Sequence, residues 1–386
     1  MPSRRLRILM TTGTQPGHFW PMAPLGWALQ AAGHEVEVGC LPDLAPFVGA
    51  AGLTARVVGQ GVDLEEILAE LGGGGSGFWS QIGDLRGLVR WNARAAIPLV
   101  DGLLESVRVR PPDVIVHPPT ELAGPLFAGL LGRPAVLHPF GLPLRPSVSS
   151  AFRSGGAALR NRYGLPDRPG DPSLVLDFCP PTLAAAADLP ESKARPLRYI
   201  PYSGTATIPD WVREPSAGRR VLLTFGTEPP AAESVARLAE TAEAVAGDGV
   251  EVVLPLPASL SGEQLPKVGP DVRVVDWSPL PVTAASCDLL LHSGEAGSTF
   301  TALSVGVPQV AIPTVAEENR HAGALEGAGV GRSVRWDRPL SEVAAAVRRV
   351  LDEPAYQKAA SALAEESRQM PAPAAAVSWI EELAQG

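Results

Sequence analysis

The segment with the clearest capacity for chemistry is a loop rich in glycine and hydroxyl groups, HSGEAGST, at residues 292–299. It follows an apolar run typical of a buried strand and precedes a short helical pattern. Gly294 and Gly297 would let the backbone approach a ligand closely, and free N–H groups at a helix start attract anions. The side chains that could add hydrogen bonds to a diphosphate are those of His292, Ser298 and Thr299. The same letters also fit an ordinary strand-to-helix turn with a serine N-cap.

Other signatures of phosphate binding are missing. Neither of the two candidate strand-to-helix turns carries GxGxxG, and GxxxxGK[ST] does not occur. No Asp-x-Asp pair is present to hold a divalent metal beside a nucleotide sugar. A diphosphate at residues 292–299 would therefore be neutralised by backbone amides without a metal ion.

His18 is the second candidate for chemistry. It lies in the loop TTGTQPGHFW, after the first predicted strand, at the sheet edge where ligands of α/β folds bind. An imidazole has a free pKa of about 6.5 and suits general-base work near neutral pH. The alternative is a histidine that merely hydrogen-bonds a loop carbonyl.

Alternating strands and helices must position these groups. In the first half, Leu6–Thr11 and Glu35–Leu41 are predicted strands around a helix at Pro21–Ala32. A second series follows residue 218, with predicted strands at Val221–Phe225, Glu251–Leu256, Arg273–Val275, Leu289–His292 and Gln309–Pro313. This rhythm predicts an α/β protein with two Rossmann-like β/α/β domains that face each other across a cleft. A single larger doubly wound sheet is the alternative.

The predicted domain boundaries follow from these two series. Residues 1–200 form an N-terminal domain, and 201–218, rich in Pro, Gly and Ser, form a linker. Residues 219–370 form a C-terminal domain. Residues 371–386 contain a helix that is expected to pack back on the N-terminal domain.

Two long insertions, 54–105 and 141–172, interrupt the first domain and are predicted to be lids or ligand loops. Phe78, Trp79 and Trp91 lie in the first insertion and could line an apolar acceptor pocket. The same aromatic side chains could instead anchor the lid.

The order of the C-terminal motifs resembles a known family, the inverting, nucleotide-sugar-dependent glycosyltransferases of GT-B fold from actinobacteria that decorate antibiotic aglycones. The family signature W-x-P-[LQ], H-x-G-x-x-G-[ST], G-V-P-Q and an acidic-polar pair is present in order. Here it appears as Trp277-Ser278-Pro279-Leu280, His292–Ser298, Gly306–Gln309 and Glu317-Glu318. Leu280 stands where many UDP-sugar enzymes have Gln, which resembles the dTDP-sugar branch.

The resemblance implies a role for each matched residue of the C-terminal half. Residues Trp277, Pro279 and Leu280 would hold the base, and His292 with Gly294 to Thr299 would hold the diphosphate. Thr227, in TFGT, would add a second phosphate contact, and Glu317 and Glu318 would bind sugar hydroxyls. The commoner acidic-polar pair is Asp-Gln, so Glu-Glu indicates an unusual deoxysugar or aminosugar. The alternative for the two glutamates is a solvated helix start.

In the N-terminal half the resemblance makes His18 the base that deprotonates the acceptor hydroxyl. Many relatives orient this histidine with an Asp, but the aligned residue here is Pro118. Glu121 is the nearest carboxylate and could serve instead, or it could cap the following helix.

The predicted activity is a single-displacement transfer of a (deoxy)sugar from a dTDP-sugar to a hydrophobic natural-product aglycone, with no cofactor and no metal. Two alternatives are an epimerase or hydrolase of the same fold, for which no paired carboxylates are evident, and a non-catalytic donor-binding or activator partner. His18 argues against the last of these.

Charge and hydropathy argue against nucleic acid and membrane as binding partners. The 386 residues carry 32 Lys+Arg and 41 Asp+Glu, for a net charge of −9. Residues 1–200 have 18 basic and 17 acidic side chains, and residues 201–386 have 14 and 24. Neither half has the basic field that nucleic-acid binding needs, and no apolar run is long enough to span a membrane. Three cysteines without CxxC spacing fit a reducing cytoplasm, and homodimerisation is left open.

Overall fold

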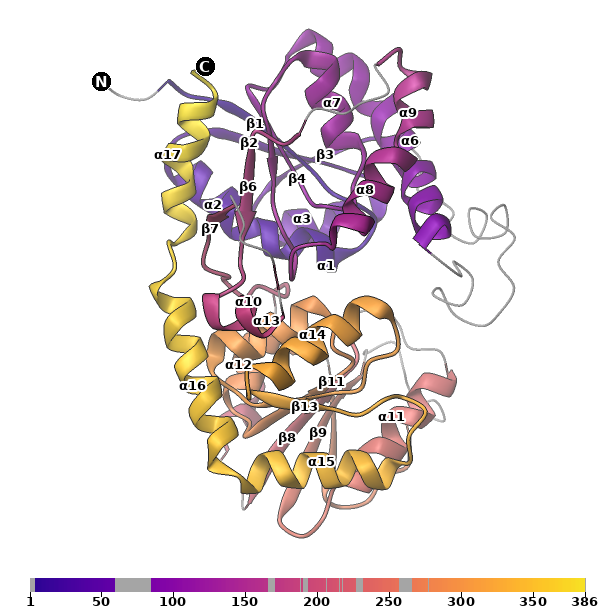
Figure 1. Cartoon of the computed structure of the whole chain (residues 1–386), viewed down its shortest axis with the longest axis vertical. Helices are drawn as coiled ribbons and strands as arrows, with labels where there is room; N and C mark the ends of the chain where they lie inside the picture. Colours follow the sequence, from indigo (N-terminus) through magenta and orange to yellow (C-terminus); the bar gives the residue numbers. More distant parts are fainter. Residues whose placement is uncertain are drawn as a thin grey trace. The chain divides into compact units, whose positions relative to one another are not determined.

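The computed structural model describes residues 4–59, 85–165, 171–187, 189, 194–205, 207–214, 216, 218–226, 232–256, 266–276 and 278–385. The chain divides into two compact units. The first comprises Met1–Phe178, Lys193–Leu197 and Pro371–Gly386, and the second comprises Cys179–Ser192 and Arg198–Met370. Each unit contains one parallel sheet (Figure 1).

The first unit is built on a seven-stranded sheet of order β3-β2-β1-β4-β5-β6-β7. Its strands are β1 (Arg7–Thr11), β2 (Glu35–Cys40), β3 (Thr54–Val57), β4 (Val114–His117), β5 (Ala135–Leu137), β6 (Leu174–Asp177) and β7 (Arg195–Pro196). Every pair is parallel. The carboxyl ends of all these strands therefore lie at one edge, where the loop after β1 carries His18.

Helices cover this sheet because successive strand residues are apolar on both faces. They are α1 (Pro16–Phe19), α2 (Ala23–Ala31), α3 (Ala45–Ala50), α6 (Leu85–Val109), α7 (Ala123–Leu131), α8 (Pro146–Gly155), α9 (Ala157–Arg162) and α17 (Pro373–Leu383), with short 3₁₀ turns at Trp20–Met22 and Pro42–Leu44. Leu9 and Ile115 pack with α6 and α7 in one cluster. A Cβ on Gly26 of α2 would lie 3.4 Å from the Met10 sulfur.

The last helix, α17, belongs to the first unit although it ends the chain. It packs against α2. Glu381 lies 3.2 Å from Nε2 of buried His34, whose Nδ1 accepts a hydrogen bond from the Leu6 amide. His34 thus contacts both α17 and the residue that precedes β1.

The second unit has a six-stranded parallel sheet of order β10-β9-β8-β11-β12-β13. Its strands are β8 (Arg219–Thr224), β9 (Val250–Leu256), β10 (Val272–Asp276), β11 (Leu289–His292), β12 (Gln309–Ala311) and β13 (Gly331–Ser333). Its helices are α10 (Pro181–Ala186), α11 (Ala232–Val245), α12 (Leu280–Ala285), α13 (Ala296–Val305), α14 (Ala316–Gly327), α15 (Leu340–Asp352) and α16 (Pro354–Gln369), with a 3₁₀ turn at Asp210–Val212.

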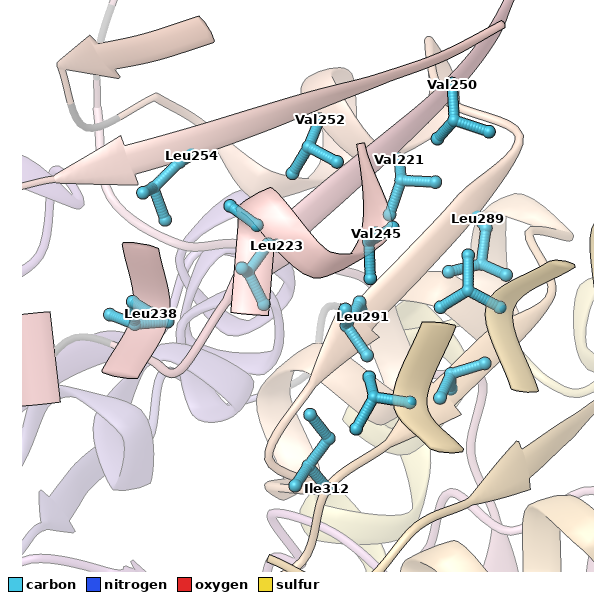
Figure 2. Packing of buried hydrophobic residues seen from close by; sticks show 14 of the residues in the cluster. Val221, Leu223, Leu238, Val245, Val250, Val252, Leu254, Leu289, Leu291 and Ile312 are labelled. Atoms are coloured by element: carbon cyan, nitrogen blue, oxygen red, sulfur yellow. The ribbon is translucent and has the colours of Figure 1, made fainter. Parts of the chain in front are cut away.

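The core of the second unit shows why its strands are apolar throughout. Leu289 and Leu291 of β11 belong to a cluster with residues of α11 and α15 (Figure 2). Leu290, between them, belongs to a different cluster with Ala284 of α12 and Ala302 of α13. Successive residues point to opposite faces of a strand, so helices must cover both faces.

These sheets confirm the prediction of two parallel α/β units, and the alternative of one larger sheet is wrong. The division differs from the predicted boundary at residue 200 because the segment Cys179–Ser192 belongs to the second unit. There α10 packs on α14, and a Cβ on Gly327 would lie 3.0 Å from the Ala186 carbonyl oxygen. No described helix is both long enough and apolar enough to cross a membrane.

Candidate functional site

The glycine loop of the second unit leaves the centre of its sheet. His292 ends β11 and pairs with Thr224 of β8 on one side and Ala311 of β12 on the other. The loop then turns through Gly294, whose φ of 96° favours glycine, and α13 begins at Ala296. The N-cap residue, Glu295, makes no side-chain hydrogen bond to the start of α13, and the amides in the first turn of a helix attract anions.

Two imidazoles hydrogen-bond to the backbone of Gly294, one to its N–H and one to its carbonyl group. The Gly294 N–H donates to Nδ1 of His292 at 3.0 Å, and Nδ1 of His321 donates to the Gly294 carbonyl at 2.9 Å. Burial lowers the pKa of His292 to about 3 and that of His321 to about 4, so both rings are neutral. The two neutral imidazoles therefore fix the glycine loop.

His292 has a structural role in the glycine loop through one of its two ring nitrogens. Its side chain is completely buried, and its Nδ1 is committed to the loop backbone. Nδ1 positions Gly294, whereas Nε2, which carries the proton of the neutral ring, is buried and has no hydrogen-bond partner among the described residues. The contact of His292 with a diphosphate therefore stays a prediction. His321 was missed, although its place in α14, three and four residues after the acidic pair, puts all three on one helix face.

The hydroxyl groups of the loop differ from each other. Ser298 is buried and its Oγ donates to Oε1 of Glu295 at 2.7 Å. Thr299 is also buried, and within the described chain its Oγ1 has no hydrogen-bond partner. Gln309 of β12 donates to the Thr299 carbonyl at 3.3 Å and braces the first turn of α13.

The two glutamates at the start of α14 also divide their roles. Oε2 of Glu318 accepts from the Thr314 amide at 2.7 Å, from the Thr314 hydroxyl at 2.8 Å and from the Val315 amide at 3.1 Å. One carboxylate oxygen of Glu318 therefore caps the start of α14, a role that differs from the solvated helix start considered from the sequence. Its backbone also lines Gly294, since a Cβ on that glycine would lie 3.0 Å from the Glu318 carbonyl oxygen.

Glu317 is the member of the pair that stays available. Its Oε1 is buried, and no hydrogen-bond partner for it exists among the described residues. Burial raises the pKa of Glu317 to about 7, against the lowering effect of Arg320, and Glu318 adds to the rise. The carboxyl group is thus close to half-protonated at neutral pH.

The raised pKa of Glu317 predicts a pH-dependent stability. The folded chain holds this proton up to about pH 7, whereas an unfolded glutamate loses it near pH 4.5. Stability from this group is therefore lost as pH rises from 4.5 to 7. Glu317→Gln should remove that loss, so that the variant gains about 1–3 kcal/mol over the wild type between pH 5 and pH 8.

Urea unfolding at pH 5, 6, 7 and 8 measures this gain. Glu240→Gln, an exposed glutamate on α11, is the control and should show no comparable pH-dependent gain. A difference between Glu317→Gln and wild type that stays constant with pH would contradict the prediction.

The predicted base-binding segment lies before and within α12. The Leu280 amide donates to the Ser203 hydroxyl at 3.2 Å, and Pro279 supplies the N-cap position. Leu280 packs on the cluster that includes Ala284 and Leu290. Trp277 and Thr227 lie outside the described residues.

In the first unit His18 lies in α1, on the loop after β1. Its half-buried ring stacks on Phe140, with centroids 4.6 Å apart and planes at 11°. A Cβ on Gly13 would lie 3.6 Å from His18 Nδ1. Burial lowers the pKa of His18 to about 4, so the imidazole is neutral at pH 7.

Glu121 does not orient His18 directly. Its carboxylate accepts hydrogen bonds from the Thr11 hydroxyl at 2.6 Å, from the Gly124 amide at 2.8 Å and from the Ala123 amide. In the described chain no hydrogen bond joins it to His18. Burial raises the pKa of Glu121, and these donors work in the opposite direction. Its role is to cap α7 and tie that helix to β1.

Trp91 is buried on α6 and lines a small hollow. The same hollow is bounded by Thr12, Gly13 and Thr14 of the loop after β1 and by Glu121. Phe78 and Trp79 lie outside the described residues. The residue predicted for the acceptor pocket and the loop that carries His18 thus share one hollow within this unit.

Two more buried histidines end neighbouring strands of the first unit. Nδ1 of His117, at the end of β4, donates to the Pro118 carbonyl, and Nδ1 of His138, just after β5, donates to the Pro139 carbonyl. Burial lowers the pKa of each to about 4. A repeated His-Pro dipeptide, in HPP and HPF, is the sequence pattern that could have identified these two histidines. No described group of three or more His, Cys, Asp and Glu residues could hold a metal ion.

Two family models match the chain. Residues 27–226 match the model described as erythromycin biosynthesis protein CIII-like, N-terminal domain, and residues 239–383 match its C-terminal counterpart. A relative from Streptomyces niveus, L-demethylnoviosyl transferase, is 33% identical over 376 residues, which cover 96% of each chain.

Solved structures of two glycosyltransferases are similar to this chain over nearly its whole length. The glycosyltransferase SnogD from Streptomyces nogalater is 32% identical, with a TM-score of 0.82, over 99% of this chain and all of its own. The SsfS6 glycosyltransferase of Streptomyces sp. SF2575, complexed with thymidine diphosphate, is 31% identical, with a TM-score of 0.82, over 98% of this chain and all of its own.

Proposed function

The chain belongs to the erythromycin biosynthesis protein CIII-like family and is a glycosyltransferase of GT-B fold, and from this premise we propose that it transfers a deoxysugar from a dTDP-linked donor to a hydrophobic natural-product aglycone. Donor binding is supported by the N-terminus of α13, where the N-cap side chain makes no capping hydrogen bond and where two histidines hold the preceding Gly294 in place. The thymidine diphosphate in the complex of SsfS6 supports the choice of nucleotide.

The proposed reaction is a single displacement with inversion. His18 takes the proton of the acceptor hydroxyl, and the acceptor oxygen forms a bond to the anomeric carbon while the bond from that carbon to the diphosphate oxygen breaks. The neutral state of the His18 ring supports this role. The leaving diphosphate is stabilised by the first amides of α13.

Donor specificity is proposed to depend on Glu317 more than on Glu318. Glu318 accepts three hydrogen bonds from residues at the start of α14. Oε1 of Glu317, in contrast, has no hydrogen-bond partner in the part of the chain that the structure describes. A buried carboxyl oxygen without a partner is unfavourable, and a sugar hydroxyl would satisfy it.

Binding through amide dipoles predicts a particular response to salt and chelators. dTDP should bind with EDTA present, and its Kd should change by less than about three-fold between 50 and 500 mM NaCl, because backbone amides release no counterions. Isothermal titration calorimetry measures the Kd, and release of dTDP from dTDP-sugars in the presence of aglycones tests turnover.

Two results would count against the proposal. A steep loss of affinity with added salt would indicate a cationic phosphate site in place of the α13 terminus. Turnover abolished by EDTA and restored by Mg²⁺ would contradict metal independence.

A further inference from the structure

Glu295 brings a negative charge into the glycine loop. It is the N-cap residue of α13, and it occupies a position that the family motif H-x-G-x-x-G-[ST] leaves open. Its amide donates to the Ser293 hydroxyl at 3.4 Å, and its carbonyl accepts from the Thr299 amide at 3.0 Å. Its backbone is therefore part of the turn that is proposed to cradle the diphosphate.

The side chain of Glu295 is held over the same turn. Oε1 accepts from the Ser298 hydroxyl at 2.7 Å. Oε2 lies so close to Gly226 that a Cβ there would be 2.6 Å away. Gly226 follows β8 with a φ of 89°, immediately before the predicted phosphate contact Thr227. The carboxylate thus lies between the two loops that the donor phosphates are proposed to touch.

A carboxylate is well suited to this position when no donor is bound. The Glu295 side chain makes no capping hydrogen bond to α13, but the positive end of a helix dipole stabilises a nearby negative charge. A bound diphosphate would need the same dipole and the Ser298 hydroxyl, and it would meet the charge of Glu295 at short range. The two anions therefore compete for one site.

We propose that the carboxylate of Glu295 occupies the phosphate position of the donor site and must swing away from Ser298 and Gly226 for a nucleoside diphosphate to bind. This inference rests on the proposed donor function. It makes Glu295 a determinant of donor affinity: the residue stands in for the phosphate in the free enzyme and weakens the binding of dTDP and its sugars.

Calorimetric titration of the full chain with dTDP and with thymidine tests the inference. Glu295→Gln keeps the size and a carbonyl oxygen for Ser298, and Glu295→Ala removes the side chain. Each should bind dTDP about ten-fold more tightly than wild type, because the competing charge is lost. Thymidine, which has no phosphate, should bind all three proteins equally. Glu342→Gln, an exposed glutamate on α15, removes the same charge far along the chain and should leave the dTDP affinity unchanged.

The outcomes separate this inference from the function on which it rests. An unchanged or weaker dTDP affinity in both variants would overturn the role of Glu295 while leaving the donor site intact. Thymidine affinity that rises with dTDP affinity would also overturn it, since a loosened loop and not charge would be responsible. Absence of dTDP binding to wild type and to both variants would refute the donor site itself and the inference with it.

Discussion

Replacing His18 by alanine should reduce kcat by about 10²–10⁴-fold, the usual contribution of a positioned general base. The affinity for dTDP should stay within about two-fold of wild type, because His18 is proposed to act on the acceptor hydroxyl, which dTDP does not carry. The measurement is steady-state release of dTDP with an aglycone, together with calorimetric titration of dTDP.

The pH dependence adds a second readout for His18. Because burial lowers its pKa to about 4, the ring stays neutral at pH 5.5, where a free imidazole would be largely protonated. Wild-type turnover should therefore persist at pH 5.5. His34→Gln is the matched control: it breaks the contacts to Glu381 and Leu6 and should lower stability with kcat unchanged. Full activity of His18→Ala would eliminate this residue as the base.

Gly294→Ala should damage both folding and donor binding. The φ of 96° is unfavourable for alanine, and the new Cβ would lie 3.0 Å from the Glu318 carbonyl oxygen and 3.3 Å from its Cβ. The expected loss in the free energy of unfolding is about 1–3 kcal/mol. The dTDP affinity should fall by about 10–100-fold, since Gly294, which both His292 and His321 hydrogen-bond, forms the turn that leads into α13.

Two other glycines separate these effects. Gly297 lies in the first turn of α13, and a Cβ there would meet nothing within 4 Å. Gly297→Ala should therefore leave stability unchanged or raise it by up to about 1 kcal/mol, yet weaken dTDP binding where the diphosphate approaches the backbone. Gly323→Ala in α14, with the same open surroundings, should have the same small effect on stability and should leave dTDP binding unchanged. Urea unfolding and titration of the three variants would expose any mismatch.

Local patterns sufficed to predict the architecture. Central strands such as β4 and β11 are short apolar runs, because a parallel sheet is covered on both faces, and this pattern needs no knowledge of distant contacts. The edge strands β3, β7 and β13 lack this pattern. The prediction of strands near Leu9 and Leu290 succeeded for that reason. That Cys179–Ser192 belongs to the second unit was not predictable, since it depends on the packing of α10 against α14.

The sequence by itself determined which loops could do chemistry, because glycine spacing, an N-terminal histidine and an acidic pair can be read without coordinates. Only the tertiary structure decided what each of those side chains touches. It commits His292 and Glu318 to backbone groups, turns Glu121 toward α7 and Thr11, adds His321 to the glycine loop and lays Glu295 over Gly226. The hydrogen-bond partners Thr11 and Glu121 lie 110 residues apart in sequence, so no local pattern could have distinguished a capping carboxylate from a catalytic one.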